Sequence, residues 1–155
     1  MELTEETKQK IKDEYAAFEA VQYAGKTKEE RSNLGAFFTP AELSIKMIEK
    51  YDNLKGTILD PTCGAGGLLA AAIIAGADSK KCYGIELDEK ILKVAQHRLG
   101  QLGVPEKNLH QGDALKDSCY QFPTEDNETY EYDAKSHCGK LLKNGKAAFR
   151  FGGMK

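Results

Sequence analysis

A short glycine-rich segment and a downstream carboxylate have the spacing of a ligand-binding site. Gly64, Gly66 and Gly67 lie close together, and Asp60 precedes them. Because glycines lack a Cβ and tolerate positive φ, the chain can turn tightly there beneath a bound molecule. Glu86 follows about 20 residues later, the distance at which a carboxylate accepts hydrogen bonds from ribose hydroxyls. The spacing therefore predicts a nucleoside-binding site.

The composition of this segment favours S-adenosylmethionine over a dinucleotide. Dinucleotide enzymes typically show G-x-G-x-x-G opening a helix that faces a pyrophosphate. Residues 60–67 (DPTCGAGG) lack the third glycine at that spacing and begin with Asp60-Pro61. A carboxylate at the strand end suits the cationic amino acid part of S-adenosylmethionine better than it suits a diphosphate. We therefore expect S-adenosylmethionine, and not NAD, at this turn.

Four segments, in this order, resemble the motifs of N6-adenine DNA methyltransferases, especially the modification subunits of type I restriction systems. They are residues 37–40 (FFTP), 60–67 (DPTCGAGG), 83–88 (YGIELD) and 111–115 (QGDAL). Residues 142–148 (LKNGKAA) resemble a later hairpin of the same family. The resemblance implies an α/β, Rossmann-like methyltransferase fold, here with an incomplete parallel sheet, and a role in DNA methylation and restriction-modification.

The resemblance also implies which residues contact S-adenosylmethionine. Phe38 and Thr39 would contact its methionine part, and Asp60 would hold its amino group. Glu86 would bind the ribose hydroxyls, Leu87 would pack on the adenine ring, and Asp113 would accept from the adenine N6 amine. Each also has a purely structural alternative, such as an aromatic ring that fills the core or an aspartate that caps a turn. The full set assigned to the cofactor is Phe38, Thr39, Asp60, Pro61, Cys63, Gly64, Gly66, Glu86, Leu87, Asp113, Ala114 and Leu115.

The catalytic motif of that family is absent. Family members present a flipped base to the methyl group with an Asn/Asp/Ser-Pro-Pro-aromatic element, whereas no two of the four prolines here are adjacent. Tyr132 and Asp133 are the remaining candidates for a stacking ring and an acceptor, and residues 130–133 alternatively read as a remnant of the fourth strand. The interval from residue 115 to residue 142 is also too short for the usual fourth strand, catalytic loop and helix. We therefore expect a homodimer or a partner protein to cover the truncated sheet edge.

These motifs require a parallel sheet with helices to position them. Residues 1–36 are predicted as a helical segment and residues 37–155 as the S-adenosylmethionine-binding domain. Alternating apolar strands and helices indicate the sheet: strands are predicted at 56–60, 81–86 and 108–111, and helices at 68–75 and 88–102.

The flanking segments show weaker patterns. One amphipathic helix is predicted over residues 4–30, and Gly25 with the charged residues 26–31 is expected to end or kink it before a loop at 33–35. Thr39 is expected to cap a second helix whose apolar stripe is Leu43, Met47, Ile48 and Tyr51. Residues 118–124 are predicted as loop. Residues 141–151 are predicted as a helix end, an Asn-Gly turn and a strand.

Composition excludes several classes of protein. No apolar run approaches the length of a membrane span and the first residues are acidic, so we expect a cytoplasmic protein without a membrane partner. The four cysteines form no C-x-x-C pair, and His137-Cys138 has no second pair nearby, so no metal site is predicted. The net charge of −2 argues against a uniformly basic nucleic-acid-binding surface, although the charged residues from 135 to 155 are all basic.

Three functions remain open at this point. The first is an S-adenosylmethionine-binding relative of DNA adenine methyltransferases that does not methylate bases by itself and serves as a subunit, regulator or competitor of a modification enzyme. The second is an active small methyltransferase that acts on DNA adenine or on another acceptor. The third is a non-enzymatic module that binds nucleic acid through the basic segment.

Overall fold

A computed structural model describes residues 1–115, 119–123, 128–133, 138–143 and 146–152 of the 155-residue chain. Beyond residue 115 it describes the side chains of Thr129, Glu131 and Tyr132. The chain divides into two compact units, Met1–Gln111 and Gly112–Lys155. The predicted division after residue 36 stays a prediction.

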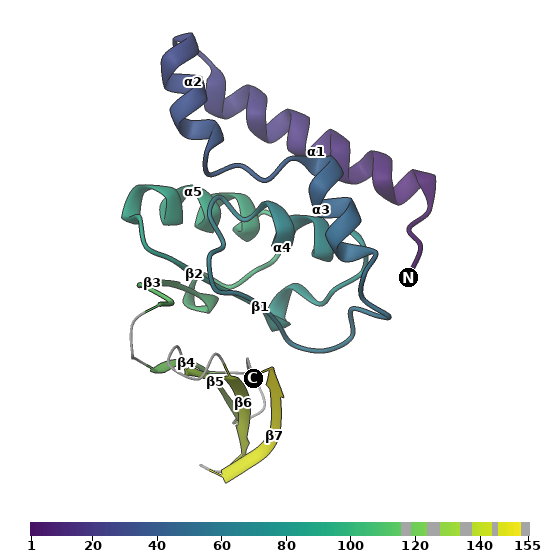
Figure 1. The fold of residues 1–155 in the computed structure, drawn as a ribbon, viewed down its shortest axis with the longest axis vertical. Helices are drawn as coiled ribbons and strands as arrows, with labels where there is room; N and C mark the ends of the chain where they lie inside the picture. Colours follow the sequence, from purple (N-terminus) through teal and green to yellow (C-terminus); the bar gives the residue numbers. More distant parts are fainter. Residues whose placement is uncertain (116–118, 124–127, 134–137, 144–145, 153–155) are drawn as a thin grey trace. The chain divides into compact units, whose positions relative to one another are not determined.

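The first unit contains the predicted parallel sheet. Strands β1 (Ile58–Asp60), β2 (Cys82–Glu86) and β3 (Leu109–Gln111) pair in the order β1-β2-β3, and both pairs are parallel. Helices α4 (Gly67–Ile74) and α5 (Glu89–Gly100) connect them, with short 3-10 helices η1 (Ser79–Lys81) and η2 (Glu106–Asn108) before β2 and β3. Figure 1 shows α4 and α5 on the same side of this sheet. The strands and helices confirm the α/β, Rossmann-like prediction.

Local sequence explains both connecting helices. Helix α4 is apolar almost throughout and buries Leu69, Ala70 and Ala72 completely, as expected for a helix packed on more than one side. Helix α5 begins where predicted, because the carboxylate of Asp88 accepts hydrogen bonds from the backbone N–H groups of Lys90 and Ile91, at 2.8 and 3.2 Å. These two helices and the strands form the core of the unit.

The N-terminal part of the chain differs from its prediction. The first predicted helix, α1 (Glu5–Tyr23), ends just before Gly25, which is one of the two outcomes predicted for that glycine. A second helix, α2 (Lys28–Gly35), follows and occupies the segment 33–35 that was predicted as loop. Gly25 has a φ of 70° after α1. The Thr27 side chain then accepts from the N–H of Glu30 at 3.2 Å and starts a new helix.

Helix α3 (Ala41–Ile48) presents a different face to the core from the one predicted. Its buried residues are Ala41, Ser44, Ile45 and Ile48, whereas Leu43, Met47 and Tyr51 are exposed. Pro40, not Thr39, occupies the cap position, and no side chain caps the helix. Of the predicted stripe, Ile48 alone was correct.

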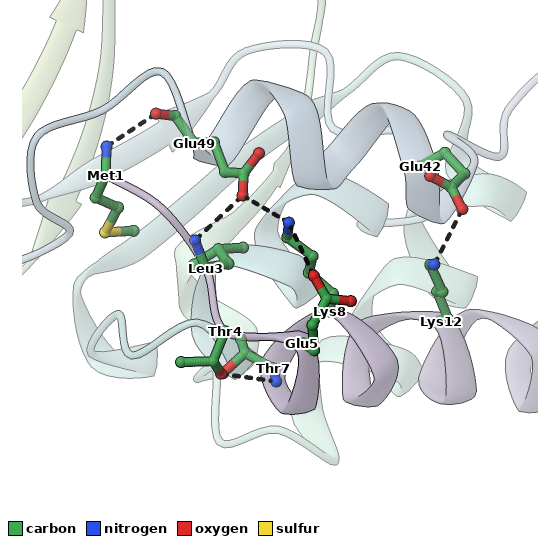
Figure 2. A network of polar contacts seen from close by, with 9 residues as sticks. All are labelled: Met1, Leu3, Thr4, Glu5, Thr7, Lys8, Lys12, Glu42 and Glu49. Carbon is green, nitrogen blue, oxygen red and sulfur yellow. Dashed lines mark hydrogen bonds and ion pairs between the residues drawn. The ribbon is translucent and has the colours of Figure 1, made fainter.

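Polar contacts join α1 to α3 (Figure 2). The Glu49 carboxylate accepts from the N–H of Leu3 at 3.1 Å and lies 3.3 Å from the Lys8 ammonium group, while Lys12 and Glu42 form a second ion pair at 3.2 Å. The Leu3 N–H, more than the Lys8 charge, lowers the pKa of Glu49. In Figure 1, α1 lies over the layer formed by α3, α4 and α5.

The second unit is a four-stranded antiparallel sheet. Its strands β4 (Cys119–Pro123), β5 (Glu128–Asp133), β6 (Cys138–Lys143) and β7 (Lys146–Gly152) pair in sequence order. The loop predicted over 118–124 and the helix end predicted at 141–142 are therefore wrong, while the final strand is confirmed. The Asn-Gly turn at 144–145, His137 and the side chains of the basic segment lie outside the described residues.

None of the described helices is both long and apolar enough to cross a membrane. The described side chains also form no group of three potential metal ligands. The cytoplasmic location stays a prediction.

Candidate functional site

A cavity of about 320 Å³ lies in the first unit, at the carboxyl end of the parallel sheet. Three segments surround it: the connection from α2 into α3, the glycine-rich turn after β1, and the last residue of β2. The lining residues are Ala36, Phe37, Phe38, Thr39, Pro40, Leu43, Thr62, Cys63, Gly64 and Glu86. Ligands of open parallel sheets bind at this end of the strands.

The glycine-rich turn fits closely between two other segments of the site. The N–H of Cys63 donates to the carbonyl of Ile85 in β2 at 2.9 Å, and the N–H of Ala65 donates to the carbonyl of Phe37 at 3.3 Å. Gly64 has a φ of 54°, and a Cβ on it would lie 2.8 Å from the Phe37 carbonyl oxygen. Glycine is therefore needed at this position both for its conformation and for its size.

Glu86 ends β2 and lines the cavity, with 9% of its surface exposed. Its Oε2 accepts from the backbone N–H of Asp88 at 3.0 Å, which fixes the orientation of the carboxylate. The other oxygen, Oε1, makes no hydrogen bond to any residue that the structure describes. A rigid carboxylate with one oxygen available suits a ligand that donates hydrogen bonds, such as a sugar hydroxyl.

Asp60 lies beside this site but outside the cavity lining. Its Oδ1 accepts from the N–H of Thr62 at 3.1 Å, which shapes the start of the turn. Burial raises the pKa of the Asp60 carboxyl, and the nearby charge of Glu86 adds to the increase. Burial also raises the pKa of the Cys63 thiol and brings that of Cys82 to about 12, so both are inert as nucleophiles at neutral pH.

The two adjacent phenylalanines have different environments. Phe38 is 5% exposed and packs edge-on against Phe18 at 4.9 Å, with Tyr23 stacked at 5.7 Å. Phe37 is 39% exposed and also lines the cavity. Phe37 therefore presents the more accessible ring, although the family resemblance implied the cofactor role for Phe38.

The structure brings together part of the predicted cofactor set. Phe38, Thr39, Cys63, Gly64 and Glu86 line the cavity, whereas Asp60, Pro61, Gly66 and Leu87 do not. The lining residues absent from that set are Ala36, Phe37, Pro40, Leu43 and Thr62. The FFTP motif was the available signal for Phe37 and Pro40. Leu43 was missed because it was assigned to the core.

The remaining predicted residues belong to the second unit. The Asp113 carboxylate accepts from the N–H of Leu115 at 2.9 Å, so it caps a turn. Tyr132 pairs with Tyr120 and Gly139 inside the antiparallel sheet and is 6% exposed. The side chain of Asp133 lies outside the described residues. The roles proposed for these three residues stay predictions.

Comparison with known proteins identifies the family. The sequence model of the family described as N-6 DNA Methylase matches residues 17–132, which include the glycine-rich turn, Glu86, most of the first unit and part of the second. The chain belongs to the N-6 DNA methylase family. The methyltransferases of this family generally use S-adenosylmethionine, and the cavity described above lies within the matched region.

Two curated relatives are similar to part of this chain. The chain is 40% identical over 61 residues to "Type II methyltransferase M.NspV" of Nostoc sp., and the matched segment covers 37% of this chain and 13% of that protein. It is 41% identical over 54 residues to "Ribosomal RNA small subunit methyltransferase H" of Pseudothermotoga lettingae, covering 35% of this chain and 18% of that protein. The chain thus spans less than a fifth of either relative. The name of the second relative gives ribosomal RNA as the acceptor of that protein, and the name of the first gives none.

Proposed function

We propose that this chain binds S-adenosylmethionine in the cavity beside Glu86 and serves a DNA adenine modification system without methylating bases by itself. It would act there as a subunit, regulator or competitor of a modification enzyme. The observation that carries the proposal is the meeting of the glycine-rich turn, the 36–40 segment and a fixed carboxylate around one cavity. Family membership supports S-adenosylmethionine as the ligand.

The residues present fit the parts of the cofactor. Glu86 Oε1 is available for the ribose hydroxyls, and Leu87, which is 64% exposed, offers an apolar surface for the adenine ring. Phe37 and Thr39 line the cavity and are available to the methionine part. When bound, the cofactor supplies an electrophilic methyl group. The protein residues named here bind and orient it.

The absence of autonomous base methylation rests on the missing catalytic element. No Pro-Pro pair exists in the chain, and only 6% of the Tyr132 surface is exposed. The test is to incubate the chain with S-adenosylmethionine labelled in its methyl group and with unmethylated DNA. We expect labelled cofactor to be retained by the protein while DNA stays unlabelled. Label in DNA at levels proportional to the protein would contradict the proposal.

A second function is favoured by one comparison. The similarity to a ribosomal RNA methyltransferase supports an active enzyme with an acceptor other than DNA. The same labelled cofactor, offered with RNA and with protein in place of DNA, tests this function. Transfer to either acceptor would support it, and no transfer to any of the three would exclude it for the isolated chain.

A partner at the sheet edge is part of the same proposal. Within the first unit, β1 pairs with β2 alone and is therefore an edge strand. Uncovered edges of this kind favour pairing with another chain. We propose that a second copy or another protein adds to β1. Light scattering coupled to size-exclusion chromatography tests the first option, with a mass near 34 kDa expected for a dimer, twice the 17.1 kDa of one chain.

Asp60→Asn is expected to raise the stability of the fold and to lower its affinity for the cofactor. The Asp60 carboxyl has a higher pKa in the folded state than in the unfolded chain, so its ionisation destabilises the fold. The stability that the protonated carboxyl contributes is present at low pH and is lost as the pH rises through the raised pKa. Asparagine keeps the acceptor for the Thr62 N–H and removes the buried charge. At pH 7 the variant should melt about 2–4 °C higher, as scanning calorimetry would show.

The same variant should bind S-adenosylmethionine more weakly, because a neutral amide loses the attraction to the cofactor's amino group. In the wild type, the affinity for S-adenosylmethionine should fall as the pH is lowered and Asp60 becomes protonated. Because the pKa of Asp60 is raised, this fall should begin at a higher pH than it would for an aspartate with the ordinary pKa. A melting temperature that is lower at pH 7, or an unchanged affinity, would contradict this role. Asp78→Asn, which changes another aspartate that accepts a local N–H (from Lys80), is the control.

A further inference from the structure

We propose that Arg98 of α5 is a positioning residue for the glycine-rich turn and that Glu14 of α1 holds it in place. Helix α1 then helps to position the cofactor site and also covers the core. The inference deepens the proposed function and rests on it for the identity of the ligand. The contacts that support the positioning role of Arg98 all lie within the first unit.

The Arg98 guanidinium group joins α1 to the turn. Its Nε and Nη2 donate to Oε1 and Oε2 of Glu14, both at 2.7 Å, in a bidentate ion pair. Its Nη1 donates to the carbonyl of Ala65, at the middle of the turn, at 3.4 Å. Only 4% of the Arg98 side chain is exposed, against 21% for Glu14. The planar fork of arginine is what allows one side chain to reach both partners.

The same cation also contacts the aromatic cluster behind the 36–40 segment. The guanidinium carbon lies 3.9 Å from the centre of the Phe18 ring, and Phe18 packs against Phe38. Phe38 lines the cavity, as does Thr39, which follows it in the chain. Arg98 therefore contacts the turn directly and the 36–40 segment through Phe18. Two of the three segments around the cavity depend on one buried cation.

An external anchor matters here because the turn is intrinsically flexible. Ala65 lies between Gly64 and Gly66, and glycine has the widest conformational freedom of any residue. Within the turn the N–H of Gly66 donates to the carbonyl of Cys63 at 2.8 Å. Glu14 fixes the guanidinium, and the guanidinium fixes the Ala65 carbonyl. Loss of the carboxylate charge leaves Arg98 buried without its counterion, so it must move toward water and away from the turn.

The matched control comes from the same helix. Lys12 lies two positions before Glu14 on α1 and forms an ion pair with Glu42 of α3 at 3.2 Å, but it does not contact Arg98 or the turn. Its side chain is 41% exposed. Lys12→Gln therefore removes an α1 ion pair and a charge while leaving the turn's anchor in place. Glu14→Gln removes the anchor with a side chain of nearly the same shape.

The first measurement is hydrogen exchange of the protein without cofactor, followed by mass spectrometry of peptides that cover residues 61–70. We expect Glu14→Gln and Arg98→Lys to speed exchange of the Ala65 and Gly66 amides about tenfold. Lys12→Gln should leave these amides unchanged. Equal exchange in Glu14→Gln and Lys12→Gln would overturn the proposal. Glu14→Asp, which keeps the charge, should give an intermediate value and guards against a general folding defect.

The second measurement is calorimetric titration of the same variants with S-adenosylhomocysteine. A less preorganised turn should weaken binding by Glu14→Gln about tenfold, whereas Lys12→Gln should bind as the wild type does. Faster exchange with unchanged affinity would overturn the positioning role, since the anchor would then serve stability alone. If the wild type itself does not bind, the proposed function fails, and the exchange data still decide whether Arg98 anchors the turn.

Discussion

Replacing Glu86 by glutamine is expected to weaken binding of S-adenosylhomocysteine about 10–100-fold. Hydrogen bonds to a charged partner contribute about 1.5–3 kcal/mol each, and the variant keeps the shape but loses the charge. The fold should persist, because the glutamine oxygen still accepts from the N–H of Asp88, the contact that orients this side chain at 3.0 Å. Titration calorimetry of both proteins measures the change.

The control for Glu86→Gln is Glu89→Gln. Glu89 lies three residues later, at the start of α5, where its side chain is 65% exposed and pairs with Lys93 at 3.6 Å. The control removes the same charge from the same region but does not touch the cavity, so its affinity should stay within about twofold of wild type. Equal losses in the two variants would show that net charge, and not the Glu86 carboxylate, determines binding.

Gly64→Ala is expected to destabilise the fold by about 2–4 kcal/mol. Alanine at a φ of 54° carries the cost of the left-handed conformation, and its Cβ would lie 2.8 Å from the backbone oxygen of Phe37. Backbone cannot move aside as cheaply as a flexible side chain, so Phe37 and the cavity wall must shift. Thermal or denaturant unfolding measures the stability, and cofactor affinity should fall with it.

Gly25→Ala is the matched control for this effect. Gly25 has a similar φ of 70°, but a Cβ on it would have nothing within 4 Å. It therefore reports the conformational cost alone, about 1–2 kcal/mol. The difference between the variants measures the close approach of the turn to Phe37. If Gly64→Ala were no more destabilising than Gly25→Ala, the tight fit of the turn in this structure would be wrong.

The parallel sheet and its helices could be predicted because their signals are local. Asp88 caps α5 through its own neighbours, at 2.8 and 3.2 Å, and an apolar segment followed by glycines marks the exit from β1. Three strands and two helices were found in the right order on this basis. Glu86 could be predicted for the same reason, since its place at the end of β2 follows from strand length.

The buried face of α3 could not be chosen from sequence. Residues 41, 45 and 48 form one apolar stripe at helical spacing, and residues 43, 47 and 51 form another. Periodicity supports both, and only packing against the rest of the unit selects the first. The second stripe stays exposed, and Leu43 lines the cavity. Tertiary contacts, which no local pattern contains, thus decided one wall of the site.

The antiparallel sheet was missed for a related reason. Strand β4 was predicted as loop, although Tyr120 and Phe122 alternate with other residues, because the sequence after residue 115 is polar and acidic and shows no clear period. Its pairing with β5 identifies β4 as a strand. In the same way, residues 141–143 are identified as part of strand β6 by the pairing of β6 with β5 and β7. Pairing is a non-local property. The Arg98–Glu14 contact, between residues 84 positions apart, was not predicted for the same reason.

The central claim is that the cavity beside Glu86 is a cofactor site, and calorimetric titration of the 155-residue chain with S-adenosylhomocysteine tests it most directly. The account predicts saturable binding of one molecule per chain that Glu86→Gln weakens and Glu89→Gln does not. No detectable heat with a cofactor concentration in the millimolar range, or binding that Glu86→Gln leaves unchanged, would contradict it.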